Sequence, residues 1–183
     1  MATTTWNIDP THSGVHFTVR HMVISKVRGN FRKFTGTVSL DEQALSASSV
    51  TATIETVSID TGVEQRDNHL RSPDFFDAAK FPTMTFQSTK VEKGAGEGFR
   101  VTGKLTIRDV TREVVLEAEQ FGIGKDPWGN TKAAFEAKTS IDRKEFGLTW
   151  NQALEAGGVL VGEKIEIGLE IQAVKAQAAD KAA

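Results

Sequence analysis

One stretch of the chain concentrates side chains that could act on a ligand. Arg66, His69 and Arg71 fall within little more than one helical turn, with Asp67 among them. Two guanidinium groups and an imidazole in one place are suited to recognising a phosphate or another polar head group. Asp67 and Arg71 are also four residues apart, so a structural ion pair on a helix is the alternative. Ser72, His69 and Asp67 would form a hydrolytic Ser–His–Asp set only if the fold gave them the necessary geometry.

The segment that carries these residues, 58–86, interrupts a sequence whose flanks alternate like β-strands. Its apolar residues, including Leu70, Phe75 and Phe76, follow helical spacing and predict a short helical insertion near residues 63–79. A helical insertion that mixes charges with large aromatic residues in a β protein is a candidate mouth of a binding cavity. A solvated connection whose phenylalanines close one end of the core is the other interpretation.

Other kinds of chemistry find little support. The chain has no cysteine, which excludes disulfides, thiolate nucleophiles and cysteine-ligated metal centres. No second histidine stands at ligand spacing from His69, and His12 is expected to serve a turn hydrogen-bond network, so no metal site is predicted. Signatures of P-loops, dinucleotide folds, zinc peptidases and α/β-hydrolases are missing, and no cofactor is expected. The formal net charge of -2 gives no case for nucleic acid or an anionic membrane surface as a partner.

The N-terminal residues carry no basic segment followed by an apolar one, so we predict no signal peptide and expect a cytoplasmic location. A signal peptide removed from the chain would instead place the protein in the periplasm. No apolar run approaches the roughly 20 residues that a membrane-spanning helix needs. We therefore predict no membrane span.

Most of the chain predicts β-strands. The run from Ile165 to Ala173 alternates apolar residues with charged or small ones, as a strand with one buried face does. Phe31 breaks the alternation of its own strand, which predicts a bulge or bend near Arg32. Short turns join most successive strands, so we expect one antiparallel domain over residues 1–175. The polar, alanine-rich end at 176–183 predicts a disordered tail.

About eight strands follow one another in this domain, several of them about ten residues long. A long antiparallel sheet exposes edges that promote aggregation, and closing the sheet removes these edges. We therefore predict an all-β fold, an eight-stranded antiparallel barrel with the short helical insertion. An eight-stranded barrel is just wide enough either to be filled by its side chains or to hold one small ligand. A two-sheet sandwich is the alternative architecture.

The side chains of inward parity are almost all apolar, which suits an apolar ligand and equally suits a packed core. Small residues among them favour empty volume: Ala52, Gly103, Ala118, Ala133 and Ala137. The residues predicted to line the interior are Phe17, Val19, Phe34, Val38, Ile54, Leu70, Phe75, Phe76, Met84, Phe86, Leu105, Ile107, Leu116, Phe135, Ile141, Phe146, Ile167 and Leu169. Arg143 and Lys144, at a strand end, are expected to cap the barrel or to pair with acids of the insertion.

Several motifs resemble those of the YceI-like, polyisoprenoid-binding family. The chain shows W-x-I-D-x-x-H-S-x-V-x-F from Trp6 and R-G-x-F from Arg28, followed by F-x-G. The segment from Ser58 to Asp77, followed by K-F-P-T-M-T-F, is the most distinctive part of the match. G-K-L-T-I-R-D-V-T from Gly103 and D-R-K-E-F-G-L from Asp142 complete it. The resemblance spans nearly the whole chain.

This resemblance implies a lipocalin-like barrel that binds a long isoprenoid chain in its interior without catalysis. The ligand would be of polyprenyl, quinone or prenyl phosphate type, with Arg66, His69 and Arg71 as candidates for its head group. Two other functions stay open. A stress-linked interaction protein would have a filled barrel and an apolar outer patch, for example around Trp128 or Trp150, and a hydrolase would use His69. A homodimer is compatible with the sequence.

Overall fold

A computed structural model describes residues 3–155 and 157–177, and these residues are mostly β-structure. Its strands are β1 (Thr4–Ile8), β2 (Gly14–His21), β3 (Ser25–Phe31), β4 (Phe34–Leu40), β5 (Ser49–Glu55), β6 (Ile59–Asp60), β7 (Thr83–Lys93), β8 (Phe99–Ile107), β9 (Val110–Lys125), β10 (Thr131–Asp142) and β11 (Val161–Lys175). Its helices are α1 (Glu64–Arg71) and the short 3-10 helices η1 (Leu45–Ala47), η2 (Thr56–Ser58) and η3 (Arg143–Phe146). Most of the predicted tail, residues 178–183, lies outside the described residues.

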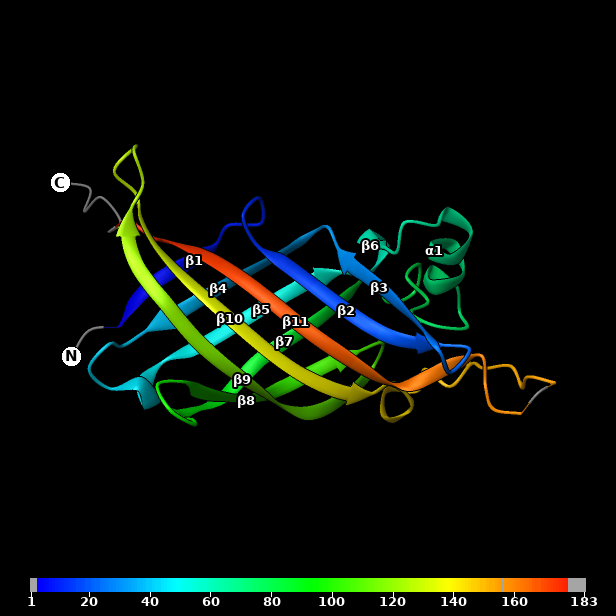
Figure 1. Ribbon diagram of the computed structural model, residues 1–183. Coiled ribbons are helices and arrows are strands. Elements are labelled where there is room, and N and C mark those ends of the chain that lie inside the picture. Colours follow the sequence, from blue (N-terminus) through cyan, green and yellow to red (C-terminus); the bar gives the residue numbers. More distant parts are fainter. Residues whose placement is uncertain (1–2, 156, 178–183) are drawn as a thin grey trace.

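The strands form one antiparallel sheet that closes on itself (Figure 1). Its order is β1-β4-β5-β7-β8-β9-β10-β11, and β1 pairs again with β11 to complete the ring. Along the earlier part of β11, β2 takes the place of β1 as its partner. The strand β3 then pairs with β2, and β6 pairs with β3. The strands β2, β3 and β6 thus continue the lines of β1, β4 and β5. The predicted eight-stranded barrel is confirmed, and the alternative sandwich is wrong.

Three of the eight barrel strands are interrupted along their length. The predicted bend near Arg32 is confirmed, because β3 ends at Phe31 and β4 begins at Phe34. Both phenylalanines are buried although their spacing breaks the alternation of a straight strand. The bend therefore turns both aromatic side chains into the interior.

The predicted helical insertion lies between β6 and β7, but its helix is shorter than the range 63–79. The helix α1 ends where the backbone N–H of Ser72 donates to the carbonyl of His69, 3.1 Å away. The backbone N–H groups of Asp77 and Ala78 then fold back onto the carbonyls of Ser72 and Arg71, both at 2.9 Å. These bonds replace a further helical turn with a compact loop that reaches β7.

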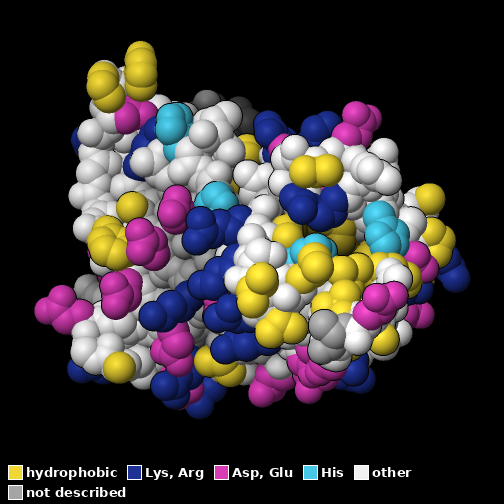
Figure 2. All heavy atoms as spheres, turned by 45° about the vertical axis from the view of Figure 1, so that its right-hand side comes forward, with side chains coloured by type: hydrophobic (Ala, Val, Ile, Leu, Met, Phe, Trp, Pro, Cys, Tyr) yellow, Lys and Arg dark blue, Asp and Glu magenta, His cyan; other side chains and the backbone are white. Residues whose placement is uncertain are grey.

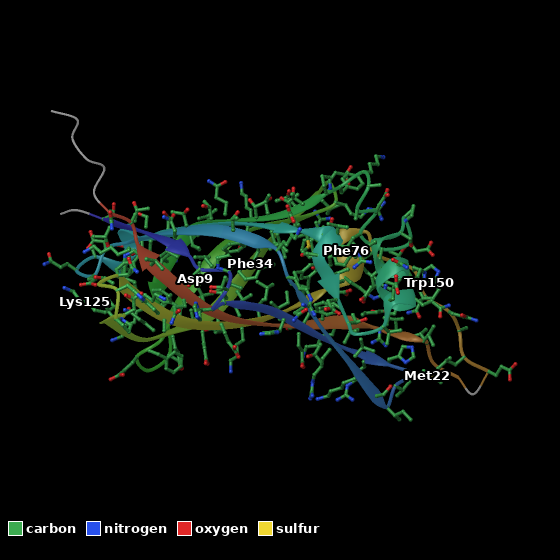
Figure 3. All side chains as sticks on the ribbon, turned by 90° about the horizontal axis from the view of Figure 1, so that it is seen from above. Asp9, Met22, Phe34, Phe76, Lys125 and Trp150 are labelled. Atoms are coloured by element: carbon green, nitrogen blue, oxygen red, sulfur yellow. The ribbon has the colours of Figure 1, made fainter. Side chains whose placement is uncertain are left out.

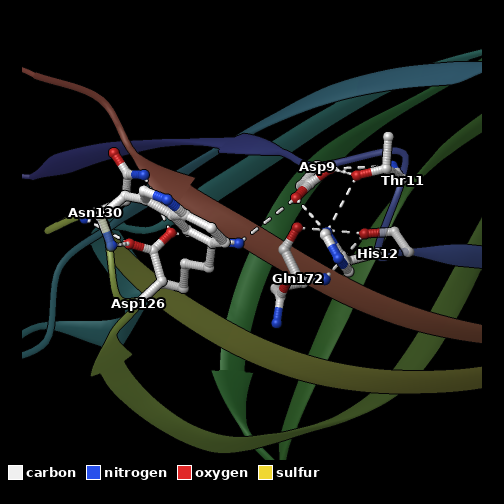
Figure 4. A network of polar contacts seen from close by, with 9 residues as sticks. Asp9, Thr11, His12, Asp126, Asn130 and Gln172 are labelled. Carbon is white, nitrogen blue, oxygen red and sulfur yellow. Dashed lines mark hydrogen bonds and ion pairs between the residues drawn. The ribbon is translucent and has the colours of Figure 1, made fainter.

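The loop between β1 and β2 is held against the outside of the barrel by a polar network (Figure 4). Asp9 accepts a hydrogen bond from the hydroxyl of Thr11 (2.6 Å) and lies 2.8 Å from Nδ1 of His12. Lys132 lies between the carboxylates of Asp9 and Asp126, at 3.8 and 3.6 Å. The expectation that His12 serves a turn network is confirmed.

The two ends of the barrel differ in their covering (Figure 1). One end, here the α1 end, carries the helical insertion, the β2–β3 hairpin and the loop from η3 to β11. The opposite end, here the η1 end, carries η1, the β7–β8 and β9–β10 turns and the first and last described residues. None of the helices in the described part of the chain is long and apolar enough to cross a bilayer.

Candidate ligand-binding cavity

The barrel encloses a cavity of about 290 Å³. Its wall extends from Leu40 and Leu45, at the η1 end, to Phe146 and Leu148, at the α1 end. Figure 3 shows Phe34 near the middle of the barrel and Phe76 and Trp150 toward the α1 end. The cavity therefore follows the long axis of the barrel.

The period of two along each strand explains why this wall is apolar. Residues that face each other across the sheet point to the same side, and the inward set consists of aliphatic and aromatic residues. All eighteen residues predicted to line the interior do line the cavity, and their contact with a ligand stays a prediction. Further large apolar wall residues, which the sequence-based list left out, are Ile8, Val15, Phe31, Leu40, Leu45, Val50, Ile59, Val91, Phe99, Val101, Val114, Leu148, Val161, Ile165 and Ile171.

Most of the additional wall residues share the strand parity of predicted neighbours, so the same alternation could have identified them. Phe31 is different, because it has the inward parity of β3, where Gly29 pairs with Phe17, and the bend changes this parity before Phe34 on β4. Ile59 lies on β6, a two-residue strand that is too short to show a period.

Three of the five small residues expected to leave empty volume do line the cavity, namely Ala52, Ala118 and Ala137. Ala133 instead packs in a separate cluster with Trp6. Gly103 lies beneath the ring of Phe86, which occupies the space over its Cα atom. The empty space is thus created mainly by alanines on β5, β9 and β10.

Aromatic side chains line the α1 end of the cavity. Phe31 and Phe76 meet edge to face with ring centroids 5.7 Å apart. Phe75 lies 5.5 Å from Trp150, whose ring meets His69 edge to face at 4.5 Å. Trp150 therefore packs against the core, and its proposed place in an outer apolar patch is wrong.

Arg143, at the start of η3, borders the cavity, but the cavity lining exposes almost no polar atoms. Only 3% of this residue is exposed. Its guanidinium donates to the carbonyl oxygens of Gly162 (2.8 Å), Leu148 (2.7 Å), Trp150 (2.9 Å) and Val161 (3.2 Å). Burial lowers the pKa of Arg143 from its ordinary value, although an arginine stays charged in proteins.

The expected roles of Arg143 and Lys144 are resolved in part. Arg143 caps the α1 end through backbone carbonyls, and Lys144 pairs with Glu163 of β11 at 2.6 Å. Pairing with acids of the helical insertion is therefore wrong. The sequence places Arg143 at a strand end. Two of the carbonyls that surround it, of Leu148 and Trp150, belong to a loop whose path the strand pattern does not predict, and the other two belong to the start of β11.

Comparisons with known proteins agree with this barrel. The family described as YceI-like domain matches residues 6–173. The chain belongs to the YceI-like domain family. Protein YceI of Salmonella newport (strain SL254) is 46% identical over 138 residues, which cover 75% of this chain and 72% of that protein. The crystal structure of Burkholderia cenocepacia BcnA aligns with a TM-score of 0.77 at 24% identity, covering 90% of this chain and 98% of that one.

A further solved structure is a polyisoprenoid binding domain from Saccharophagus degradans. It aligns with this chain at a TM-score of 0.68 and 13% identity, over 94% of this chain and 99% of that one. At this identity the likeness concerns the fold.

In this YceI-like barrel the three head-group candidates do not line the cavity. Arg66 donates to the hydroxyl of Thr61 at 2.7 Å, and Arg71 donates to the carbonyls of Val57 (2.8 Å) and Ile59 (3.0 Å). These bonds attach α1 to residues 57–61 of the segment before it. A head-group role for these residues stays a prediction, and it applies to the rim of the α1 end.

Two alternatives for the same residues are wrong. Asp67 accepts from the backbone N–H (2.8 Å) and hydroxyl (2.6 Å) of Thr61, so it does not form the ion pair with Arg71. The Ser–His–Asp set is not assembled either. The imidazole of His69 pairs with Asp74 at 2.9 Å, and the hydroxyl of Ser72 donates to the backbone carbonyl of His69. The hydrolase hypothesis thus loses the site on which it rested.

Proposed function

We propose that the protein binds one long isoprenoid chain along the barrel interior, without catalysis, and carries or stores it. The observation that carries this proposal is the cavity of about 290 Å³, whose wall is built almost wholly from aliphatic and aromatic side chains. Such a wall offers a sugar or nucleotide few hydrogen-bond partners. It offers a hydrocarbon chain dispersion contacts along its whole length.

The energetics are sufficient for a carrier. Each buried methylene contributes about 0.8 kcal/mol, so ten of them contribute roughly 8 kcal/mol, which corresponds to about micromolar affinity. The cavity lies at the lower end of the roughly 300–1,000 Å³ typical of small-molecule sites. A prenyl chain too large for this cavity volume would therefore protrude from one end or displace a wall side chain.

The family adds support of a different kind. The Saccharophagus degradans domain, which shares this fold, is described as polyisoprenoid binding. Its low identity to this chain means that the apolar wall must support the choice of ligand here. The isoprenoid chains of a quinone, a polyprenol and a prenyl phosphate are all compatible with that apolar wall.

For the head group, Arg66, His69 and Arg71 at the rim of the α1 end remain the candidates. Arg143 is nearer the cavity, but its hydrogen bonds to four carbonyls occupy four of the five N–H donors of a guanidinium. The cavity lining exposes almost no polar atoms, so this guanidinium faces the backbone carbonyls and not a ligand. A phosphate or a quinone oxygen would therefore lie at the rim, where cations would stabilise it.

The test uses the full chain purified without detergent. An organic-solvent extract read by mass spectrometry is expected to contain a prenyl lipid close to one per protein. After delipidation, geranylgeraniol is expected to bind in the micromolar range, and geraniol, with half as many isoprene units, far more weakly. Geranylgeranyl phosphate should bind more tightly than the alcohol if cations at the rim of the α1 end meet the head group. An empty extract together with no binding of geranylgeraniol would refute the proposal.

One observation favours the alternative of a protein contact. Phe121, Ile123 and Trp128 of the β9–β10 hairpin are exposed, and Trp128 is 82% exposed. Exposed apolar residues close together are typical of an interaction surface. We propose that this hairpin mediates any homodimer, for which light scattering of the wild type and of Trp128→Ser is the test. A monomer in both cases would refute this second proposal.

A further inference from the structure

The β2–β3 hairpin ends in three large apolar side chains that face solvent. Met22 is 49% exposed, Val23 61% and Ile24 86%. Val159, in the neighbouring loop before β11, is exposed as well. These four residues are here called the apolar tip. Figure 3 shows Met22 at the far extremity of the hairpin, at the same end as Trp150.

The backbone of the apolar tip is strained. Met22 and Val23 have φ angles of 53° and 69°, in the left-handed region. A β-branched residue rarely adopts this conformation, and glycine or asparagine would do so at less cost. Strained positions of this kind concentrate at functional sites. The side chains at the tip are therefore better explained by a function than by stability.

The tip is also anchored to the barrel. The backbone N–H of Met22 donates to the carbonyl of Leu160 at 2.8 Å. A Cβ atom placed on Gly158 would lie 3.4 Å from the side chain of Val23, so the hairpin and the following loop are in contact. The four apolar residues thus form one surface on two connected segments.

The arms of the same hairpin are basic. From Pro10 to Leu40 the sequence has no Asp or Glu, although the whole chain has 24 of them. Arg20 and Lys26 face each other across β2 and β3, Arg28 follows two residues later, and all three are exposed. None of the three forms an ion pair within the described residues. Figure 2 shows a band of Lys and Arg side chains beside hydrophobic side chains that gather toward the α1 end.

We propose that the apolar tip and these three basic residues dock the protein onto the surface of an anionic lipid bilayer. Apolar side chains on a projecting loop enter the boundary between head groups and acyl chains, and flanking cations are attracted by anionic head groups. A nucleic acid would use the cations but would leave the apolar tip exposed. The net charge of -2 hides this site, because acids elsewhere in the chain offset the acid-free hairpin.

Docking at this site would bring the α1 end of the cavity to the bilayer. The use of this arrangement for ligand transfer rests on the proposed function. The tip projects from the α1 end, where Leu70, Phe75 and Phe76 line the cavity. An isoprenoid chain could then pass between bilayer and barrel with little exposure to water. Docking itself does not depend on what the cavity holds.

The test is co-sedimentation of the full chain with vesicles of equal parts phosphatidylglycerol and phosphatidylcholine, compared with vesicles of phosphatidylcholine alone. The wild type should bind the anionic vesicles, and raising the salt concentration should weaken binding. Ile24→Ser should lower the partition coefficient about tenfold. Lys26→Gln combined with Arg28→Gln should lower it about 25-fold, because each cation contributes about fivefold.

Matched controls lie away from the tip and from the β9–β10 hairpin turn. Val115→Ser removes an exposed apolar side chain of β9, and Lys104→Gln removes an exposed cation of β8. Both should bind vesicles like the wild type. Equal binding to both kinds of vesicle, no binding at all, or loss of binding in Val115→Ser would overturn the proposal. A wild-type oligomer that Ile24→Ser dissociates, with no vesicle binding, would overturn it in favour of a protein interface.

The docking and ligand proposals fail separately. A prenyl lipid in the extract without vesicle binding would refute docking alone. Vesicle binding by a protein that neither yields nor binds a prenyl lipid would refute the proposed function alone.

Discussion

The ring of Phe86 lies over Gly103 on the neighbouring strand, in the space that a side chain at position 103 would need. The ring of Phe17 on β2 covers Gly29 on the neighbouring strand β3 in the same way. A glycine in a strand often marks such a close approach. Here it lets an aromatic ring approach the neighbouring strand closely.

This relationship predicts that Gly103→Val destabilises the protein. A Cβ atom at this position would lie 2.7 Å from the carbonyl oxygen of Gln87, which is backbone and cannot move aside. Overpacking of this kind costs about 1–3 kcal/mol, measurable as a lower free energy of unfolding in urea. The sequence alone suggests that a bulky residue here would only fill the cavity. Gly168→Val is the control, because nothing lies within 4 Å of its added Cβ atom, and equal losses in both variants would contradict the explanation.

Arg143 is predicted to be essential for stability. Arg143→Met would leave four carbonyl oxygens without their charged donor, in a position that is nearly free of solvent. We expect the free energy of unfolding to fall by at least about 3 kcal/mol. Arg143→Lys should recover little, because a single ammonium cannot reach carbonyls on opposite sides of a planar guanidinium.

The neighbouring residue is the control for Arg143. Lys144→Met removes a partly exposed ion pair with Glu163, and such pairs contribute less than about 1 kcal/mol. Urea unfolding of the three variants should therefore separate Arg143 clearly from Lys144. Similar losses at both positions would show that the loop between η3 and β11 is merely sensitive to any change.

Much of the fold could be predicted because its information is local. The alternation on each strand, the bend after Phe31 and the need to close a long antiparallel sheet led to an eight-stranded barrel. The same alternation placed eighteen side chains on the cavity wall, including Phe17 on β2 and Ile167 on β11. These two residues are cross-strand partners in the structure. The same alternation therefore identified inward-facing residues on strands that are far apart in the sequence.

The polar part of the site could not be predicted, because its partners are backbone groups from distant segments. Arg66 and Arg71 were predicted to meet a ligand, but carbonyls of η2 and β6 hold Arg71, and the backbone and hydroxyl of Thr61 hold Arg66. Arg143 has carbonyl partners up to 19 residues away in the chain. Spacing in the sequence indicates which side chains are near each other on one element. It does not indicate which backbone carbonyls a loop will bring to them.

Asp9 predicts a dependence of stability on acid pH. Hydrogen bonds lower the pKa of Asp9 from 3.8 to about 2. The hydroxyl of Thr11 makes the largest contribution and the side chain of His12 the next largest. Because the folded pKa lies below the ordinary value, the ionised carboxylate stabilises the fold above about pH 4, and this contribution is lost as the pH falls toward 2. In Thr11→Val the pKa of Asp9, followed by NMR of its carboxyl carbon, should rise toward 3.8. Thr89→Val, an exposed strand threonine, should leave it unchanged; an unchanged pKa in Thr11→Val would contradict the assignment.

Ala137 gives the most direct test of the cavity. Its side chain faces the empty interior from β10, so a ring introduced by Ala137→Phe would occupy space that a ligand needs. Displacing three or four methylenes would cost about 3 kcal/mol of binding free energy, which is roughly a hundredfold loss of affinity for geranylgeraniol. Titration of the delipidated variant measures this loss, and circular dichroism confirms that the barrel is retained. The adjacent Lys138 is exposed, so Lys138→Phe adds the same ring outside the barrel and should bind like the wild type. Normal affinity in a folded Ala137→Phe variant would mean that the ligand does not occupy the middle of the barrel.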